Sequence, residues 1–117
     1  MPKVSLGPCN PTFDKRIRQN PKPIMNKLEA EFHRITFAVL NEPVYIQSIK
    51  FKLANGLTYT PDFVCPRWPW ESYEVKGPHA FDGALDKLKI AATIFPHIKW
   101  VLVWKENGVW KNQVVLS

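Results

Sequence analysis

Cysteine is scarce in this chain of 117 residues. Cys9 and Cys65 are the only two, they lie far apart, and neither belongs to a CxxC pair. The sequence therefore indicates neither a disulfide scaffold nor a cysteine zinc site, and we expect two reduced thiols. Long apolar runs are also missing, because none approaches the length of a membrane span and no signal-peptide core is present. We expect a cytoplasmic protein with no membrane partner.

Several catalytic signatures are absent as well. The chain has five glycines but no glycine-rich loop of the kind that cradles phosphate, and it contains neither GxSxG nor HExxH. The sequence thus offers no serine nucleophile elbow and no helical zinc motif. It also predicts no organic cofactor.

Basic and aromatic residues, by contrast, are plentiful. Sixteen Lys and Arg against ten Asp and Glu give a formal charge of +6, and 13% of the residues are aromatic. A hydrophobic fraction of 45% is enough for a packed core. A basic surface favours a polyanion, and DNA is the partner that we expect.

The chain divides into a short segment and one domain. Residues 1–25 hold five prolines interleaved with basic residues, so an extended or irregular arm is expected there. Two interpretations remain open for this arm: contact with a phosphate backbone or partner subunit, or a solvated tail. Residues 26–117 form the domain.

The domain begins with a predicted helix. Asn26 is its expected N-cap, with Glu29 at the third helical position, and Asn41 and Pro43 end it. Its apolar stripe consists of Leu28, Phe32, Ile35 and Val39.

Strands and a second helix follow. Period-two alternation and apolar runs predict strands over residues 44–53, 57–64, 73–76, 100–104 and 109–116. A pattern break at Gln47–Ser48 predicts a bulge or two short strands, and Asn55–Gly56 predicts a hairpin turn. The second helix is expected over 80–95. The predicted fold is therefore α/β, in the order α-β-β-β-α-β with an extra C-terminal strand: a mixed central sheet flanked by helices.

Two acidic residues and a lysine have the spacing of a catalytic centre. Asp62 follows Pro61, and twelve residues later Glu74-Val75-Lys76 lies in a short strand. Because side chains alternate along a strand, Glu74 and Lys76 should share one face while Val75 enters the core. If the strands of Asp62 and Glu74 are neighbours, the polar groups meet. Adjacent carboxylates repel unless a cation lies between them, and Mg²⁺ prefers such oxygen ligands. Lys76 would then hold an attacking water or stabilise negative charge on a phosphate.

This combination resembles the PD-(D/E)XK nuclease superfamily, which includes restriction enzymes, archaeal junction resolvases and phage endonuclease I. More narrowly, the sequence resembles small phage- and prophage-encoded nucleases. The motifs that carry the resemblance are Met25-Asn26-Lys27-x-Glu29, Tyr59-x-Pro61-Asp62-Phe63 and Glu74-Val75-Lys76-Gly77. The resemblance implies a restriction-endonuclease-like core and a metal-dependent endodeoxyribonuclease, located in the host cytoplasm if a phage encodes it.

The resemblance also implies a role for each motif residue. Asp62 and Glu74 would bind Mg²⁺, for which Mn²⁺ would substitute, and the main-chain carbonyl of Val75 would complete the metal shell. The motif lysine would be catalytic. A glutamate on the first helix commonly assists the metal in this superfamily. Glu29 fits that role better than Glu31, which points about 200° away in helical projection.

Basic residues outside this centre are predicted to hold DNA. They are Arg16, Arg18, Lys27, Arg67, His79, Lys87 and Lys89. Trp68 and Trp70, in the same loop as Arg67, either stack on unpaired bases or wedge a junction, or they pack against the last strand or a second subunit. Branched DNA such as a Holliday junction is one candidate substrate, and symmetric cutting of two strands would imply a homodimer.

Two alternatives stay open on the sequence alone. The fold could serve a non-catalytic DNA-binding or assembly subunit, or the substrate could be RNA, because no residue identifies a 2′-hydroxyl contact. Glu74 and Lys76 could also form an ordinary surface ion pair of little energetic value. That interpretation leaves their agreement with Asp62 and Glu29 as coincidence.

Overall fold

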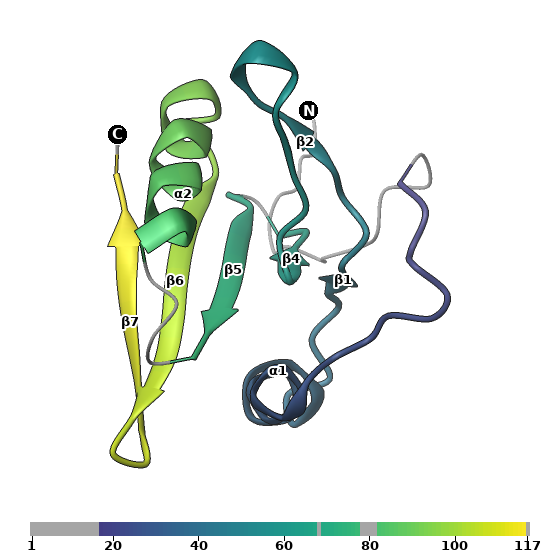
Figure 1. The fold of residues 1–117 in the computed structure, drawn as a ribbon. Helices are drawn as coiled ribbons and strands as arrows, with labels where there is room; N and C mark the ends of the chain where they lie inside the picture. Colours follow the sequence, from purple (N-terminus) through teal and green to yellow (C-terminus); the bar gives the residue numbers. More distant parts are fainter. Residues whose placement is uncertain (1–16, 68, 78–81, 117) are drawn as a thin grey trace, which may run out of the picture.

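A mixed sheet dominates the computed structural model, which describes residues 17–67, 69–77 and 82–116. Within these residues, the sheet has five strands in the spatial order β1-β4-β5-β6-β7. Their bounds are Tyr45–Ile46, Phe63–Cys65, Glu71–Lys76, Lys99–Glu106 and Val109–Val115. In the described part of the chain, two α-helices accompany the sheet, α1 (Lys27–His33) and α2 (Asp82–Ile94), and a π-helical turn, Arg34–Ala38, extends α1 (Figure 1). This arrangement confirms the predicted α/β class.

Strand directions follow from the connections between the strands. β4 is antiparallel to both of its neighbours, β1 and β5, and β6 and β7 form an antiparallel hairpin through Asn107–Gly108. β5 and β6 are parallel, so the chain must cross over between them, and α2 makes that crossover. β6 is buried on both faces over Trp100 to Val103, as its continuous apolar run predicted.

Side-chain alternation divides the core into two clusters, one on each face of the sheet. The cluster on the α2 side includes Leu88, Ala91, Ala92, Trp100 and Leu102. The cluster on the α1 side includes Phe32, Phe37, Phe63, Val75, Val101 and Val103. We call these two sides the α2 face and the α1 face.

The first helix begins as predicted and then departs from the α-helical pattern. Asn26 and Glu29 form a capping box, in which the Asn26 side chain accepts from the Glu29 backbone N–H and the Glu29 carboxylate accepts from the Asn26 backbone N–H. The chain then widens into a π-helical turn, with Val39 N–H donating to Arg34 O at 3.1 Å. The buried residue after Phe32 is consequently Phe37, five positions on. The predicted stripe was therefore wrong in its second half, and Val39 is exposed.

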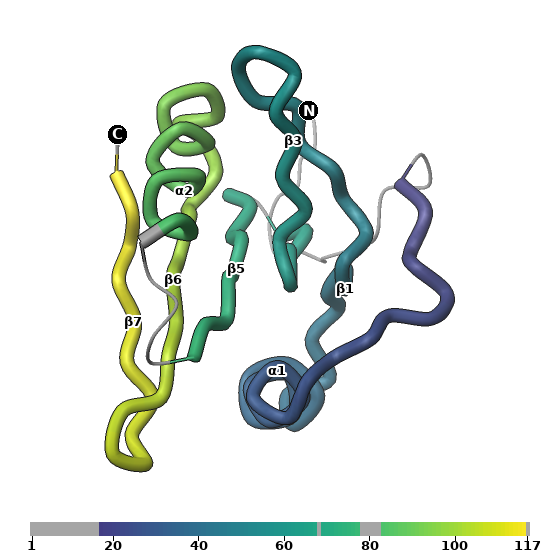
Figure 2. Tube along the Cα trace, in the orientation of Figure 1, coloured from purple at the N-terminus to yellow at the C-terminus, as the bar shows by residue number. Residues whose placement is uncertain are grey.

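Two predicted strands are each divided in the structure. The segment 44–53 breaks at Gln47, which has a positive φ of 51°, into β1 and β2 (Phe51–Lys52). The segment 57–64 is not one strand but β3 (Thr58–Tyr59) and β4, because Pro61 has no N–H to donate to a sheet. β2 and β3 pair in a separate two-stranded sheet around the predicted Asn55–Gly56 turn. Figure 2 follows this hairpin away from β1 and back again.

The described part of the arm lies along β1. The Gln19 side chain donates to Val44 O at 2.9 Å and accepts from Ile46 N–H at 2.8 Å, and Asn20 N–H donates to the Ser48 hydroxyl at 2.7 Å. These contacts tie residues 19–20 to the sheet edge without forming helix or strand. Among the described residues, no helix has the length and apolar character that a membrane crossing would require.

Candidate active site

The acidic pair lies at the ends of two neighbouring strands. The antiparallel ladder of β4 and β5 pairs Phe63 with Tyr73, Val64 with Ser72 and Cys65 with Glu71. Continuing this register by one residue places Asp62 across from Glu74, so both side chains leave the same face of the ladder. The backbone N–H of Val75 donates to Asp62 Oδ2 at 2.9 Å and fixes that carboxylate against β5.

Glu74 is a buried carboxylate with a partner on each oxygen. Its exposed fraction is only 7%. Lys76 Nζ lies 2.9 Å from Oε2, and the Tyr59 hydroxyl donates to Oε1 at 2.5 Å. Alternation along β5 brings Glu74 and Lys76 to the α2 face, while Val75 is buried on the α1 face. The side-chain directions predicted for this strand are therefore correct.

The surroundings of Asp62 and Glu74 disfavour a negative charge on Asp62. Burial, and then the negative charge of Glu74, raise the pKa of Asp62 to about 7. Burial alone would lower the pKa of Lys76, but its hydrogen bond to Glu74 and the surrounding carboxylates outweigh that effect and raise it. Burial and the charge of Glu74 also raise the pKa of Tyr59, so its hydroxyl remains a hydrogen-bond donor. One lysine thus faces two adjacent acidic groups in a partly dry environment.

A cleft opens beside Glu74. Its volume is about 450 Å³. Strand β3, the end of β5 and the first turns of α2 surround it, and its lining consists of Thr58, Tyr59, Thr60, Glu74, Lys76, Gly83, Ala84 and Lys87. The cleft therefore joins a buried carboxylate to two lysines and three hydroxyl groups.

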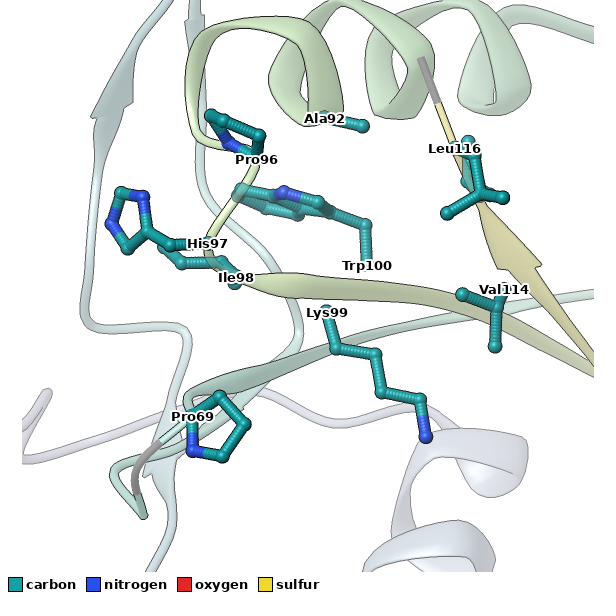
Figure 3. A pocket seen from close by; sticks show the side chains of 10 residues that line it. Pro69, Ala92, Pro96, His97, Ile98, Lys99, Trp100, Val114 and Leu116 are labelled. Atoms are coloured by element: carbon teal, nitrogen blue, oxygen red, sulfur yellow. The ribbon is translucent and has the colours of Figure 1, made fainter.

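A second hollow of about 450 Å³ lies past the C-terminal end of α2 (Figure 3). Pro96, His97, Trp100 and Leu116 contribute to its wall, and none of its lining residues is acidic. Trp100 and Lys99 project from opposite sides of β6 there. Because the two hollows have similar volumes, the carboxylates distinguish the candidate site.

The two glutamates of α1 have different roles. Glu29 Oε1 accepts from the Asn26 backbone N–H at 3.0 Å, while its charge contributes to the raised pKa of Asp62. Glu31 instead pairs with Lys105 at 2.8 Å and accepts from Trp110 Nε1 at 3.3 Å. Glu29 is therefore the helix glutamate that is electrostatically coupled to the acidic pair.

The donor set suits a cation that needs few protein ligands. Among the described residues, no group of three or more His, Cys, Asp or Glu side chains is arranged to hold a metal ion. Mg²⁺ is commonly bound by one or two carboxylates, with water and substrate phosphate completing its octahedron. Asp62 and Glu74, which repel each other at facing positions, fit that requirement. The described residues do not suit a metal site whose ligands are all protein side chains.

The predicted DNA-binding residues are dispersed over the surface. Lys87 lines the cleft, whereas Lys89 is exposed on the same helix outside the cleft lining. Arg18 and Lys27 are also exposed. Arg67 forms an ion pair with Glu42, which engages its guanidinium within the protein.

Three of the residues named in the sequence analysis lie outside the described residues: Arg16, His79 and Trp68. Trp70 packs against the core cluster of the α2 face, which includes Val115 of the last strand.

Three hydroxyl residues, Thr58, Tyr59 and Thr60, had no predicted role at the site. Thr58 and Thr60 line the cleft, and Tyr59 contacts Glu74. Tyr59 belonged to a recognised motif, but the prediction of one continuous strand over 57–64 concealed its position. A proline one residue before Asp62 was the available signal that the strand would break there.

No protein-family model, curated protein or solved structure has a significant match to this chain.

Proposed function

We propose that this protein is a metal-dependent endonuclease of the PD-(D/E)XK type that hydrolyses phosphodiester bonds in DNA. The observation that carries the proposal is the convergence of Asp62, Glu74 and Lys76. Asp62 and Glu74 lie at facing positions of adjacent strands, and Lys76 pairs with Glu74 beside an open cleft. A surface ion pair alone explains neither the burial of Glu74 nor the acidic neighbour.

The topology supports the same proposal. A helix precedes the antiparallel strands that carry the acidic pair, and α2 then crosses to a parallel strand, β6. This order agrees with the α-β-β-β-α-β arrangement of a restriction-endonuclease-like core once the divided strands are counted together. β7 is the additional C-terminal strand.

Each residue has a defined task in the proposed reaction. Asp62 and Glu74 hold Mg²⁺ or Mn²⁺, with the main-chain carbonyl of Val75 as a further ligand and Glu29 adding negative charge nearby. When bound, the ion lowers the pKa of a water molecule and polarises a phosphate oxygen. Lys76, which lines the cleft and pairs with Glu74, stabilises negative charge on the phosphate or orients the attacking water.

The cleft and the surrounding charge suit an anionic polymer. Lys87 lines the cleft, and the chain carries a formal charge of +6. Arg18, Lys27 and Lys89 are exposed basic residues outside the cleft lining. We include branched DNA among the substrates, with a homodimer as the unit that cuts two strands symmetrically.

Cleavage of supercoiled plasmid and of a labelled four-way junction tests this function. The wild type should cut in Mg²⁺ and not in EDTA, and Lys76→Ala should reduce the rate by about 10²–10³-fold. Lys99→Ala is the matched control, because Lys99 is an exposed sheet lysine that faces Glu71 and not the cleft. The proposal fails if the wild type binds DNA yet cuts neither substrate, or if both lysine variants lose activity equally. Cleavage of RNA in place of DNA would redirect the assignment.

Lys87 and Lys89 offer a test of substrate contact. Both are lysines of α2, but only Lys87 lines the cleft. Lys87→Ala should weaken DNA binding and reduce the dependence of log affinity on log salt by about one, whereas Lys89→Ala should change both less. Fluorescence anisotropy with a catalytically inactive Lys76→Ala background measures both quantities. Equal effects of the two variants would contradict the proposal that DNA binds at the cleft.

A further inference from the structure

A buried hydroxyl from outside the five-stranded sheet reaches the acidic pair. Tyr59 belongs to β3 in the two-stranded sheet, pairs across it with Phe51, and has an exposed fraction of 8%. Its hydroxyl donates to Glu74 Oε1 at 2.5 Å. The hairpin therefore both forms a wall of the cleft and contacts a proposed metal ligand.

The hydroxyl is not required for packing. The Tyr59 ring lies against Trp100, with centroids 6.2 Å apart, and a phenylalanine ring would make the same apolar contact. A buried hydroxyl is unfavourable unless it finds a partner, and here the partner is a carboxylate. The Tyr59 ring therefore contributes to packing, whereas its hydroxyl contributes a separate interaction with Glu74.

The two partners of Glu74 together restrict its carboxylate. Lys76 lies at Oε2 and Tyr59 at Oε1, so rotation about the last side-chain bond would break both contacts. Each oxygen of a carboxylate has two lone-pair directions, and one direction on each remains for another ligand. The orientation of those remaining directions is therefore set by Tyr59 and Lys76 jointly.

We propose that Tyr59 is a positioning residue for Glu74: the Tyr59 hydroxyl holds one carboxylate oxygen and so orients the remaining lone pairs of Glu74, which would be available to the cation that Asp62 and Glu74 would hold. This inference rests on the proposed metal-dependent function. It assigns to the β2–β3 hairpin a role in metal affinity. Tyr59 itself contacts neither the phosphate nor the cation and acts through Glu74.

Titration calorimetry of the metal-free full-length chain with Mn²⁺ tests this role without DNA. Tyr59→Phe should raise the dissociation constant for Mn²⁺ by about 10–100-fold, the usual effect of removing a hydrogen-bond partner of a metal ligand. In a cleavage assay the variant should need more Mn²⁺ for half-maximal rate. Its rate at saturating Mn²⁺ should return to within a few-fold of the wild type, because the reacting groups are unchanged.

Tyr73→Phe is a matched control on the neighbouring strand. Its hydroxyl donates to Glu71 Oε1 at 2.7 Å, and its side chain packs on the α1 face away from the acidic pair. Removing that hydroxyl should leave Mn²⁺ affinity within about twofold of the wild type, since Glu71 is not a proposed ligand. Thermal unfolding of both variants shows whether either has lost its fold.

A double variant separates positioning from a general effect on the cleft. If Tyr59 acts through Glu74, adding Tyr59→Phe to Glu74→Gln should weaken Mn²⁺ binding no further than Glu74→Gln alone. Additive losses would overturn the positioning role. Wild-type affinity in a folded Tyr59→Phe protein would overturn it as well, while leaving the nuclease proposal intact. Absence of Mn²⁺ binding by the wild type would overturn both proposals together.

Discussion

The two faces of β5 have opposite chemistry although their residues alternate along six positions of one strand. Tyr73 and Val75 point to the α1 face, into a cluster of aromatic and branched side chains. Glu71 begins the strand on the same side and accepts a hydrogen bond from the Tyr73 hydroxyl. Ser72, Glu74 and Lys76 occupy the other three positions, on the α2 face. The buried polar residues of this strand, Ser72 and Glu74, both lie on the α2 face.

Packing on the α1 face is continuous. The Phe32 ring lies 5.4–6.0 Å from the rings of Phe37, Phe63, Tyr73 and Trp110. Such contacts add to the burial of large apolar areas and hold the helix to the sheet. The α2 face has a comparable apolar core around Trp100, but it ends at the acidic pair and the cleft. Because successive side chains of β5 point to opposite faces, the residues that stabilise the fold on the α1 face are separate from the residues of the proposed site on the α2 face.

The largest effect that this separation predicts is on folding. Phe63 is fully buried on the α1 face, so Phe63→Ala should lower the free energy of unfolding by about 3–5 kcal/mol through lost burial and a residual cavity. Chemical denaturation followed by tryptophan fluorescence measures this change. The remaining folded protein should bind Mn²⁺ with wild-type affinity.

Phe63 also tests the separation critically, because it is adjacent to Asp62 in sequence. A control at Phe37, buried on the same face but distant in sequence, should show a loss of similar kind. If Phe63→Ala abolished Mn²⁺ binding while Phe37→Ala preserved it at equal stability, the two faces would be coupled through β4. That result would contradict the separation of stability from metal binding.

The second effect is a pH dependence that arises on the α2 face. Asp62 has a folded-state pKa of about 7 against an ordinary value of 3.8, because of burial and the nearby charge of Glu74. Between these values the folded protein retains a proton that the unfolded chain has released. The stabilising contribution is thus complete below pH 4 and is lost as pH rises through 7. Without metal, this contribution should fall by roughly 2–4 kcal/mol between pH 4 and pH 8.

Comparison with Asp62→Asn isolates that contribution. Burial lowers the pKa of His33, which gives a dependence of the opposite sign, and this effect cancels in the difference between the two proteins. The difference in unfolding free energy, measured in EDTA from pH 4 to pH 8, should follow the titration of Asp62. Mn²⁺ should stabilise the wild type more at pH 8 than at pH 5. A difference that does not change with pH would mean that the acidic pair is not strained.

A third and smaller effect distinguishes polar residues of the α2 face from one another. Among the described residues, the Ser72 hydroxyl is buried and lacks a hydrogen-bond partner. Ser72→Ala removes an unsatisfied polar atom and should raise the free energy of unfolding by about 1 kcal/mol. Mn²⁺ affinity should be unchanged, because Ser72 is not a proposed metal ligand. Weaker Mn²⁺ binding in a stable Ser72→Ala protein would extend the site along β5 and contradict this assignment.

Local chemistry made part of this molecule predictable from sequence. The capping box at Asn26, the turn at Asn55–Gly56 and the directions of Glu74 and Lys76 all depend on interactions within a few residues. The convergence of Asp62 and Glu74 was conditional on their strands being neighbours, and the pairing of β4 with β5 fulfils that condition. These features needed no knowledge of distant packing.

Features that depend on distant contacts were harder to predict. The separation of β2 and β3 from the main sheet is a tertiary event, although Pro61 and the pattern break at Gln47 marked the places where the strands divide. The contact of Tyr59 with Glu74 follows from that separation and was missed. The π-helical turn was missed because a periodicity of 3.6 residues assumes an unbroken α-helix.

The smallest predicted effect tests this helix. The α-helical stripe implies that Val39 is buried, whereas the π-helical turn leaves it 70% exposed and buries Phe37 instead. Val39→Ala should therefore change the free energy of unfolding by no more than about 0.5 kcal/mol. Val44→Ala is the matched control, because Val44 is only 6% exposed and should lose about 2 kcal/mol. Urea denaturation of both variants provides the measurement. Equal losses in the free energy of unfolding would contradict the π-helical turn and would favour a regular helix that buries Ile35 and Val39 on the α1 face.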